Sequence, residues 1–213
     1  MRTIYLVRHG KVKQEDGLRR CIGQTDLPLD DAFLPSIVEL GAWFQRKQQG
    51  RKASMMLASG TLQRASHTAA CIREGAGDII SGNIVFDTNL NEVDTGLWEN
   101  RPFEEIRANE GRLFEERGKS LGYFRFPQGE SIYEAGKRFE KGLNHFRKET
   151  GKDLILVSHA GAIRAFCVNC SHCQPMTTGS WERPTSAPRF CWMTENIFFL
   201  SGADISQPVY SVK

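Results

Sequence analysis

Three short, mostly apolar runs without alternating polarity limit the folds open to this chain more than any other feature. They are TIYLV at residues 3–7, SMMLAS at 54–59 and DLILVS at 153–158. A strand whose successive side chains are nearly all apolar is covered on both faces, as in the parallel sheets of α/β proteins. The three runs therefore predict strands inside a parallel sheet.

Segments with helical periodicity lie between and after these runs. In the first of them Ile37, Leu40, Trp43 and Phe44 share one stripe, as in a helix packed on a sheet. The predicted helices span residues 34–48, 61–75, 102–116, 131–148 and 161–170. Further strands are predicted at 83–87, 189–194 and 196–201, the last two as a hairpin or at a neighbouring edge. This alternation predicts a three-layer α/β/α sandwich with a mostly parallel central sheet.

Helix boundaries and domain organisation follow from local signals. Gly50 is expected to end the first helix, Ser59 or Thr61 to cap the second, and Gly75 to end it. Residues 91–130 carry more charge and less strand character, so we expect a small helical cap over the edge of the sheet. The 213 residues contain no internal repeat and no linker, which predicts a single domain over 1–213.

Composition argues against several classes of protein. Apolar residues make up 40% of the chain and charged residues 25%, values typical of globular proteins. The net charge of +3 is too weak to indicate nucleic-acid binding, and no stretch approaches the length of a membrane span. The N-terminus lacks the pattern of a signal peptide, so a cytoplasmic location and thiols at the six cysteines are expected.

Basic side chains stand where the predicted strands end. Arg8 and His9 follow the first strand, His159 follows the strand at 153–158, and Arg64 lies in the first turn of the helix after the second strand. The carboxyl ends of parallel strands meet at one edge of a sheet, so these side chains should share one crevice. Guanidinium groups bind phosphate oxygens bidentately, which predicts a phosphate ligand. One imidazole could then attack phosphorus while the other donates to a phosphate oxygen.

The motifs that carry these residues are LVRHG at 6–10, an S-x-x-L-x-R-A-x-x-T-A pattern at 59–69, LNE at 90–92 and VSHAGAIR at 157–164. Together, and in this order, they resemble the histidine phosphatase superfamily, the phosphoglycerate-mutase-like proteins. The segments GQTDLPL, GLWEN and PQGES extend the resemblance, which covers residues 3–166.

The resemblance implies a role for each matching residue. His9 would take the phosphoryl group as phosphohistidine, and Glu92 would protonate the leaving oxygen and then deprotonate water. Glu99 is the rival for this acid role, because it is the other carboxylate of the same loop. The residues expected to bind phosphate or the rest of the substrate are Arg8, His9, Arg64, His159, Ala160 through its backbone N–H, and Gln24. No metal or organic cofactor is implied, because the arginines supply the positive charge.

The implied activity is hydrolysis of a small-molecule phosphate monoester by a monomer or a homodimer, with no nucleic-acid or membrane partner. The alternative is a cofactor-dependent phosphoglycerate mutase. Such mutases carry an arginine-rich E-R-x-Y-G segment, whereas here Glu92 is followed by Val93 and Asp94, which favours the hydrolase. A binding module without activity is a third reading, but it would lack His9, Glu92 or His159, and all three are present.

The loops RRCIGQTDLPL and GLWENRPFEEI most resemble α-ribazole-phosphate phosphatases, which act in cobalamin assembly. A sugar phosphatase or a phosphatase of broad specificity is the competing interpretation. Many members also carry Glu-Thr after RHG and an aspartate where Gly60 stands. These departures leave the phosphate pocket unchanged and bear on the substrate instead.

A second motif, CVNCSHC, raises a zinc hypothesis for Cys167, Cys170, His172 and Cys173. On a helix Cys167 and Cys170 could share a face, but Cys173 would lie well round from Cys167, and the chain offers no second ligand pair. Buried or half-buried thiols are the favoured interpretation. His67 and His145 stand among polar neighbours and are predicted to lie on the surface.

Overall fold

The computed structural model describes residues 3–13, 16–48, 54–169 and 197–201. Its strands form one sheet in the order β3-β2-β4-β1-β5, and each pair of neighbours runs parallel. The strands are β1 (Ile4–Arg8), β2 (Met55–Ser59), β3 (Val85–Phe86), β4 (Asp153–Ser158) and β5 (Ile197–Ser201). The parallel sheet predicted from the apolar runs is therefore confirmed.

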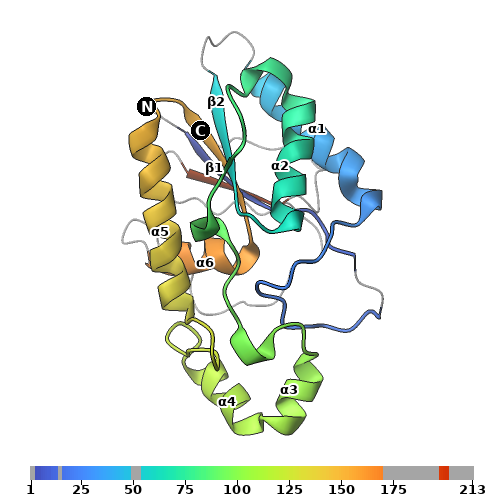
Figure 1. Cartoon of the computed structure of the whole chain (residues 1–213), viewed down its shortest axis with the longest axis vertical. Helices are drawn as coiled ribbons and strands as arrows, with labels where there is room; N and C mark the ends of the chain where they lie inside the picture. The colour runs from blue at the N-terminus through green and yellow to red at the C-terminus, as the bar shows by residue number, and fades with distance from the viewer. Residues whose placement is uncertain (1–2, 14–15, 49–53, 170–196, 202–213) are drawn as a thin grey trace, which may run out of the picture.

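Helices cover both faces of this sheet. They are α1 (Leu34–Lys47), α2 (Gln63–Ala76), α3 (Phe103–Asn109), α4 (Gly111–Lys119), α5 (Ile132–Glu149) and α6 (Ala160–Asn169). Short 3-10 turns lie at η1 (Asp31–Phe33), η2 (Gly77–Ile79), η3 (Thr88–Leu90) and η4 (Gly96–Trp98). Helices α1 and α2 lie on one side of the sheet, α5 and α6 on the other, and α3 and α4 beyond one end of it (Figure 1). This arrangement is the predicted three-layer sandwich with a helical cap.

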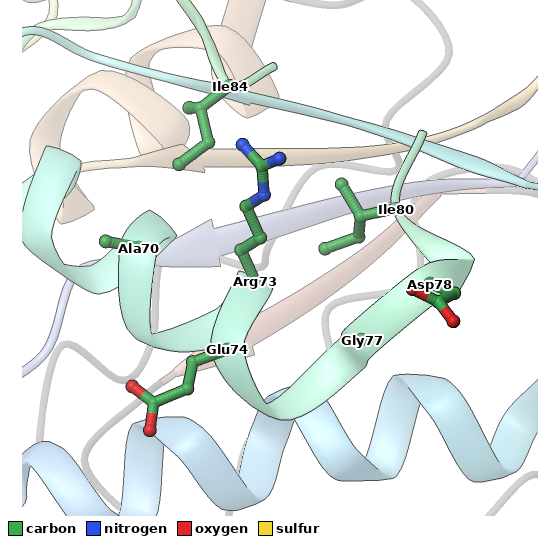
Figure 2. Close-up of a pocket in the computed structure, with 7 residues that line it drawn as sticks. All are labelled: Ala70, Arg73, Glu74, Gly77, Asp78, Ile80 and Ile84. Atoms are coloured by element: carbon green, nitrogen blue, oxygen red, sulfur yellow. The ribbon is translucent and has the colours of Figure 1, made fainter. Parts of the chain in front are cut away.

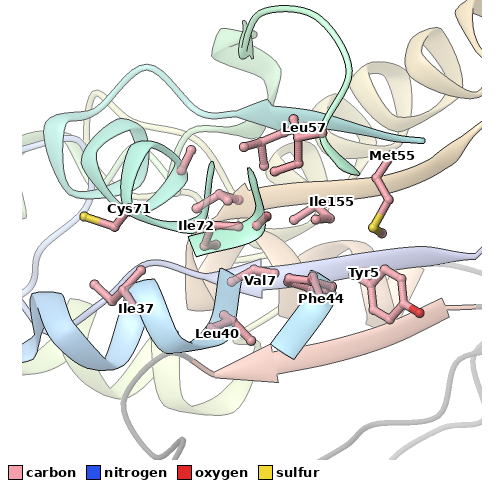
Figure 3. Packing of buried hydrophobic residues seen from close by; sticks show 14 of the residues in the cluster. Tyr5, Val7, Ile37, Leu40, Phe44, Met55, Leu57, Cys71, Ile72 and Ile155 are labelled. Carbon is pink, nitrogen blue, oxygen red and sulfur yellow. The ribbon is translucent and has the colours of Figure 1, made fainter. Parts of the chain in front are cut away.

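The central strands divide their side chains between two apolar clusters. In β1, Tyr5 and Val7 pack under α1 and α2, whereas Ile4 and Leu6 pack under α5 and α6. Strand β4 alternates in the same way. Figure 3 shows the first cluster, with side chains from α1 and α2 meeting those of the sheet. Because both faces are covered, these strands show no polar alternation in sequence.

Glycines set the close packing of α1 against α2. A methyl group added at Gly75 would lie 1.9 Å from the Val38 carbonyl oxygen, and one at Gly41 would lie 2.2 Å from the Ile72 carbonyl oxygen. Gly75 therefore lies inside α2 and does not end it, contrary to the prediction. The helix ends at Gly77, whose φ of +58° suits glycine.

The structure corrects two further boundary predictions. Neither Ser59 nor Thr61 caps α2; its first N–H, at Gln63, donates instead to Asp26 Oδ1 at 2.7 Å. The helix predicted at 102–116 is two helices, because the backbone breaks at Glu110 with φ −132° and ψ 38°. Gly50 and the strand predicted at 189–194 lie outside the described residues, and the last strand, β5, extends the sheet beside β1.

The segment from 91 to 130 builds a third apolar cluster around the buried indole of Trp98. The indole N–H donates to Glu110 Oε2 at 2.8 Å, which ties η4 to the junction between α3 and α4. Phe114 stacks on the indole, and Phe126 meets its edge. Within the described residues, no helix is long and apolar enough to cross a membrane.

Candidate active site

The two histidines at the strand ends lie side by side. Strands β1 and β4 are direct neighbours with Arg8 in register with Ser158, so His9 and His159 leave the sheet together. The backbone N–H of His9 donates to the Ser158 carbonyl at 2.9 Å, and the centroids of the two imidazole rings are 5.0 Å apart. Both side chains are buried.

The backbone fixes the protonation of His9. Its Nδ1 lies 2.7 Å from the carbonyl oxygen of Gly10, which can only accept, so Nδ1 carries the proton and Nε2 keeps its lone pair. Burial, together with the charges of Arg64 and Arg8, lowers the pKa of His9 to about 3. The imidazole is therefore neutral at physiological pH and presents an unprotonated Nε2.

His159 has the opposite arrangement. Arg64 Nε donates to His159 Nδ1 at 3.2 Å, which places the His159 proton on Nε2. Burial, followed by electrostatic interaction with His9 and Arg64, lowers the pKa of His159 well below its ordinary value, so this ring is also neutral. Its Nε2 is buried without a hydrogen-bond partner among the described residues. A buried donor of this kind is costly unless a ligand oxygen accepts from it.

Arg64 lies almost wholly buried at the start of α2. Its Nη1 donates to the Thr25 carbonyl at 2.6 Å and its Nη2 to the Gly23 carbonyl at 2.5 Å. Burial lowers the pKa of the guanidinium, while Glu92, Asp26 and Glu99 oppose that effect. With the bond to His159, three of the five N–H groups are used, and two are left for a ligand.

Glu92 sits on the amino end of α6, the helix that begins directly after His159. Its carboxylate accepts from the backbone N–H groups of Val93 at 2.9 Å, Gly161 at 3.1 Å and Ala162 at 2.7 Å. Gly161 is needed for this approach, because a methyl group there would lie 2.4 Å from Glu92 Oε1. Unpaired N–H groups at a helix start attract negative charge, which explains why an acidic side chain is held beside the histidines.

Glu99, the rival carboxylate, is saturated with donors. It accepts from the backbone N–H groups of Gly23, Gln24, Thr25 and Thr95 and from both threonine hydroxyls, at 2.7 to 3.1 Å. Burial raises the pKa of this carboxyl, but the hydrogen bonds from Thr25, Gln24 and Thr95 outweigh it, so the pKa is lowered. Glu99 therefore anchors the loop whose carbonyls hold Arg64.

Residues 4–187 match the family model of the histidine phosphatase superfamily, branch 1. The chain belongs to the histidine phosphatase superfamily. A protein named probable phosphoglycerate mutase GpmB from Yersinia pestis (strain Pestoides F) is 29% identical over 164 residues, covering 76% of this chain and 72% of that protein.

Two solved structures share the fold. A mycobacterial glucosyl-3-phosphoglycerate phosphatase has a TM-score of 0.63 at 23% identity, covering 76% of this chain and 78% of that one. The α-ribazole phosphatase of Shigella flexneri has a TM-score of 0.60 at 20% identity, covering 78% and 77%. At these identities the likeness concerns the fold of histidine phosphatases.

The remaining predicted site residues of this member of the superfamily lie nearby. Gln24 is exposed, and its side-chain Nε2 donates to the Glu92 carbonyl at 3.2 Å. Arg8, half-buried at the end of β1, lies close enough for its charge to lower the pKa of both histidines. Ala160 is the first residue of α6, half-buried beside His159.

Sequence reasoning missed the polar groups that hold the loop before Glu92. The Ser158 hydroxyl donates to the Leu90 carbonyl at 2.6 Å, and Asn91 Oδ1 accepts from the Thr61 N–H at 2.7 Å. Arg138, on α5, also holds this loop, because its guanidinium donates to the carbonyls of Asn89 and Glu92. A polar residue at a strand end is an ordinary loop signal, and a charged residue on an amphipathic helix reads as solvated. The family motif PQGES, which ends just before α5, was the one available signal.

Other predicted features lie outside this site. Cys167 is half-buried on α6 against the second apolar cluster, whereas Cys170, His172 and Cys173 lie outside the described residues. His67 and His145 are exposed, as predicted.

A surface hollow of about 640 Å³ lies at the carboxyl end of α2, where Arg73, Glu74 and Asp78 line it (Figure 2). It is remote from the histidines, since Arg64 stands at the opposite end of α2.

Proposed function

We propose that this chain is a phosphomonoester hydrolase that acts on a small molecule through a phosphohistidine at His9. The observation that carries the proposal is the pair of neutral histidines with opposite tautomers. His9 offers a lone pair on Nε2, whereas His159 offers an N–H from the same atom. A nucleophile and a donor on two rings whose centroids are 5.0 Å apart, beside two arginines, suit a phosphoryl group between them.

In the first step His9 Nε2 attacks phosphorus, the bond from phosphorus to the ester oxygen breaks, and Glu92 delivers a proton to that oxygen. In the second step Glu92 takes a proton from water, the water oxygen attacks phosphorus, and the bond from phosphorus to His9 breaks. Arg8, Arg64 and the Nε2–H of His159 bind the equatorial oxygens in both steps, and the N–H of Ala160 adds a donor. No metal or organic cofactor is part of these steps.

Hydrolysis is favoured over mutase activity by the residues after Glu92. Val93 is buried in the cap cluster, and Asp94 accepts from the Gly96 N–H at 2.9 Å, so this stretch presents no cation to a substrate carboxylate. A phosphoglycerate mutase must bind that carboxylate and keep the phosphoryl group. The mutase remains the second candidate, supported by the name of the Yersinia relative.

For the substrate we propose α-ribazole 5′-phosphate, and hence a role in cobalamin biosynthesis, with a sugar phosphate as the alternative. The loop resemblance supports the first, and the names of the two solved structures are compatible with either. We also propose a cytoplasmic location, which the thiols of Cys21 and Cys71 support.

The role of Glu92 is tested by the dependence of rate on the leaving group. An alkyl phosphate leaves as a basic alkoxide and needs the proton, whereas p-nitrophenolate scarcely does. General acid catalysis contributes roughly 10²- to 10⁴-fold, so Glu92→Gln should lower turnover of the alkyl ester by that order and that of p-nitrophenyl phosphate far less.

Vanadate inhibition of Glu92→Gln is the control, because phosphate binding should survive. Equal losses on both esters would remove Glu92 from the acid role. In the same assays, wild-type enzyme should release free phosphate and form no isomerised phosphoglycerate. Isomerisation, with or without 2,3-bisphosphoglycerate, would favour the mutase.

A further inference from the structure

The loop that carries Glu92 is held by its carbonyl groups. Every backbone carbonyl from residue 88 to residue 92 accepts a hydrogen bond from a side chain. Ser158 supplies one of these bonds, to Leu90. Arg138, on α5, donates to the other four carbonyls, and the Glu92 carbonyl also accepts from Gln24 Nε2 at 3.2 Å. The turn η3 packs against α5. One side chain therefore sets most of this loop.

The guanidinium of Arg138 is fully used in doing so. The two hydrogens on its Nη1 are shared among the carbonyls of Thr88 at 3.2 Å, Asn89 at 2.7 Å and Asn91 at 3.1 Å, and its Nη2 donates to that of Glu92 at 3.2 Å. Glu130 holds the other edge, with Oε1 2.6 Å from Nη2 and Oε2 3.3 Å from Nε. Glu130 Oε1 also accepts from the Asp94 N–H at 2.9 Å, so the pair grips the chain on both sides of Glu92.

We propose that Arg138 is a positioning residue that aims the Glu92 carboxyl at the leaving oxygen. This inference rests on the proposed function of Glu92. Arg138 holds the Glu92 backbone on one side, and the amino end of α6 holds its carboxylate on the other. A lysine cannot replace this arrangement, because an ammonium group is compact and cannot bridge four carbonyls with a planar fork.

The test compares Arg138→Lys with wild-type enzyme on an alkyl phosphate and on p-nitrophenyl phosphate. A displacement of about 1 Å at a reacting group costs roughly 10²-fold, so we expect a loss of roughly 10- to 100-fold on the alkyl ester and little on the nitrophenyl ester. Arg101→Lys is the matched control. Arg101 is also paired with a glutamate, Glu110, at similar exposure and donates to a carbonyl, that of Leu97, but it lies in the cap.

A second comparison separates positioning from a structural role. In the Glu92→Gln background, Arg138→Lys should cost the alkyl ester less than about twofold, because residues that act through one group are not additive. Should Arg138→Lys fail to fold, Glu130→Gln replaces it, since it loosens the guanidinium and keeps the arginine. Glu130→Gln should also lower turnover of the alkyl ester selectively, by a smaller factor than Arg138→Lys.

The outcomes distinguish this inference from the proposed function. A selective loss in Glu92→Gln but an equal loss on both esters in Arg138→Lys, or in Glu130→Gln if that variant is used, would overturn the inference alone. A full further loss from Arg138→Lys in the Glu92→Gln background would also overturn it. An unselective loss in Glu92→Gln would overturn the acid role of Glu92, and this inference with it.

Discussion

Two glutamates of one loop are held by backbone N–H groups, and the number of donors separates their roles. Glu99 accepts six hydrogen bonds, from 23–25 on one side and from Thr95 on the other. Glu92 accepts three, at a helix start beside the histidines. The sequence left both as candidates for the acid, because spacing along the chain does not reveal which carboxylate meets the strand ends.

Replacing Glu99 should weaken phosphate binding through Arg64. In Glu99→Gln one oxygen becomes an NH2 group that faces donors, so the loop at 23–25 shifts and its carbonyls no longer hold Arg64. The loss of a buried charged acceptor costs about 1.5 to 3 kcal/mol. A loss of about 1.5 kcal/mol in the free energy of vanadate binding corresponds to roughly a tenfold rise in the vanadate inhibition constant.

The control is Glu105→Gln, in which an exposed partner of Arg101 is changed and vanadate inhibition should not move. A vanadate inhibition constant in Glu99→Gln equal to that of wild-type enzyme would show that the loop does not position Arg64.

The strands could be predicted because their signals are local. Three apolar runs became β1, β2 and β4, and parallel pairing alone brought together the basic residues that follow them, His9, His159 and Arg64. Contacts between segments that are distant in the sequence could not be predicted. Asp26 caps α2 from a distant loop, and Arg138 lies on the helix α5 although it serves the loop at 88–92.

Two helical glycines should respond oppositely to substitution by alanine. Gly75 lies in α2 where a methyl group would overlap the Val38 carbonyl, so Gly75→Ala should destabilise the protein by roughly 1 to 3 kcal/mol. Gly118 lies in α4 with nothing within 4 Å of an added methyl group, so Gly118→Ala should stabilise it by about 0.5 to 1 kcal/mol. Urea unfolding measures both, and equal effects would contradict the role of Gly75 in the α1–α2 contact.

For the molecule as a whole, burial of the histidine pair makes stability depend on pH. The pKa of His9 falls from 6.5 to about 3 on folding, so between these values the unfolded chain binds a proton that the folded protein does not. Stability therefore falls as the pH drops below 6.5, by about 1.4 kcal/mol per pH unit for each such proton. His159 adds to this in the same direction.

Urea unfolding of wild-type protein and of His9→Asn should show this effect. The variant should lose stability less steeply below the ordinary pKa of 6.5, and the difference between the two proteins should be constant above it. Parallel curves throughout the acid range would mean that His9 is protonated in the folded protein as readily as in the unfolded chain.

The phosphoryl group on His9 Nε2 is the one covalent state on which the proposed chemistry depends. Rapid quenching of wild-type enzyme with ³²P-labelled phosphate ester should trap a protein-bound phosphoryl group that is stable in base and labile in acid. Peptide mapping should place it on His9, and His9→Ala should neither form the adduct nor turn over substrate. Ordinary turnover in His9→Ala, or a labelled residue other than His9, would contradict the mechanism.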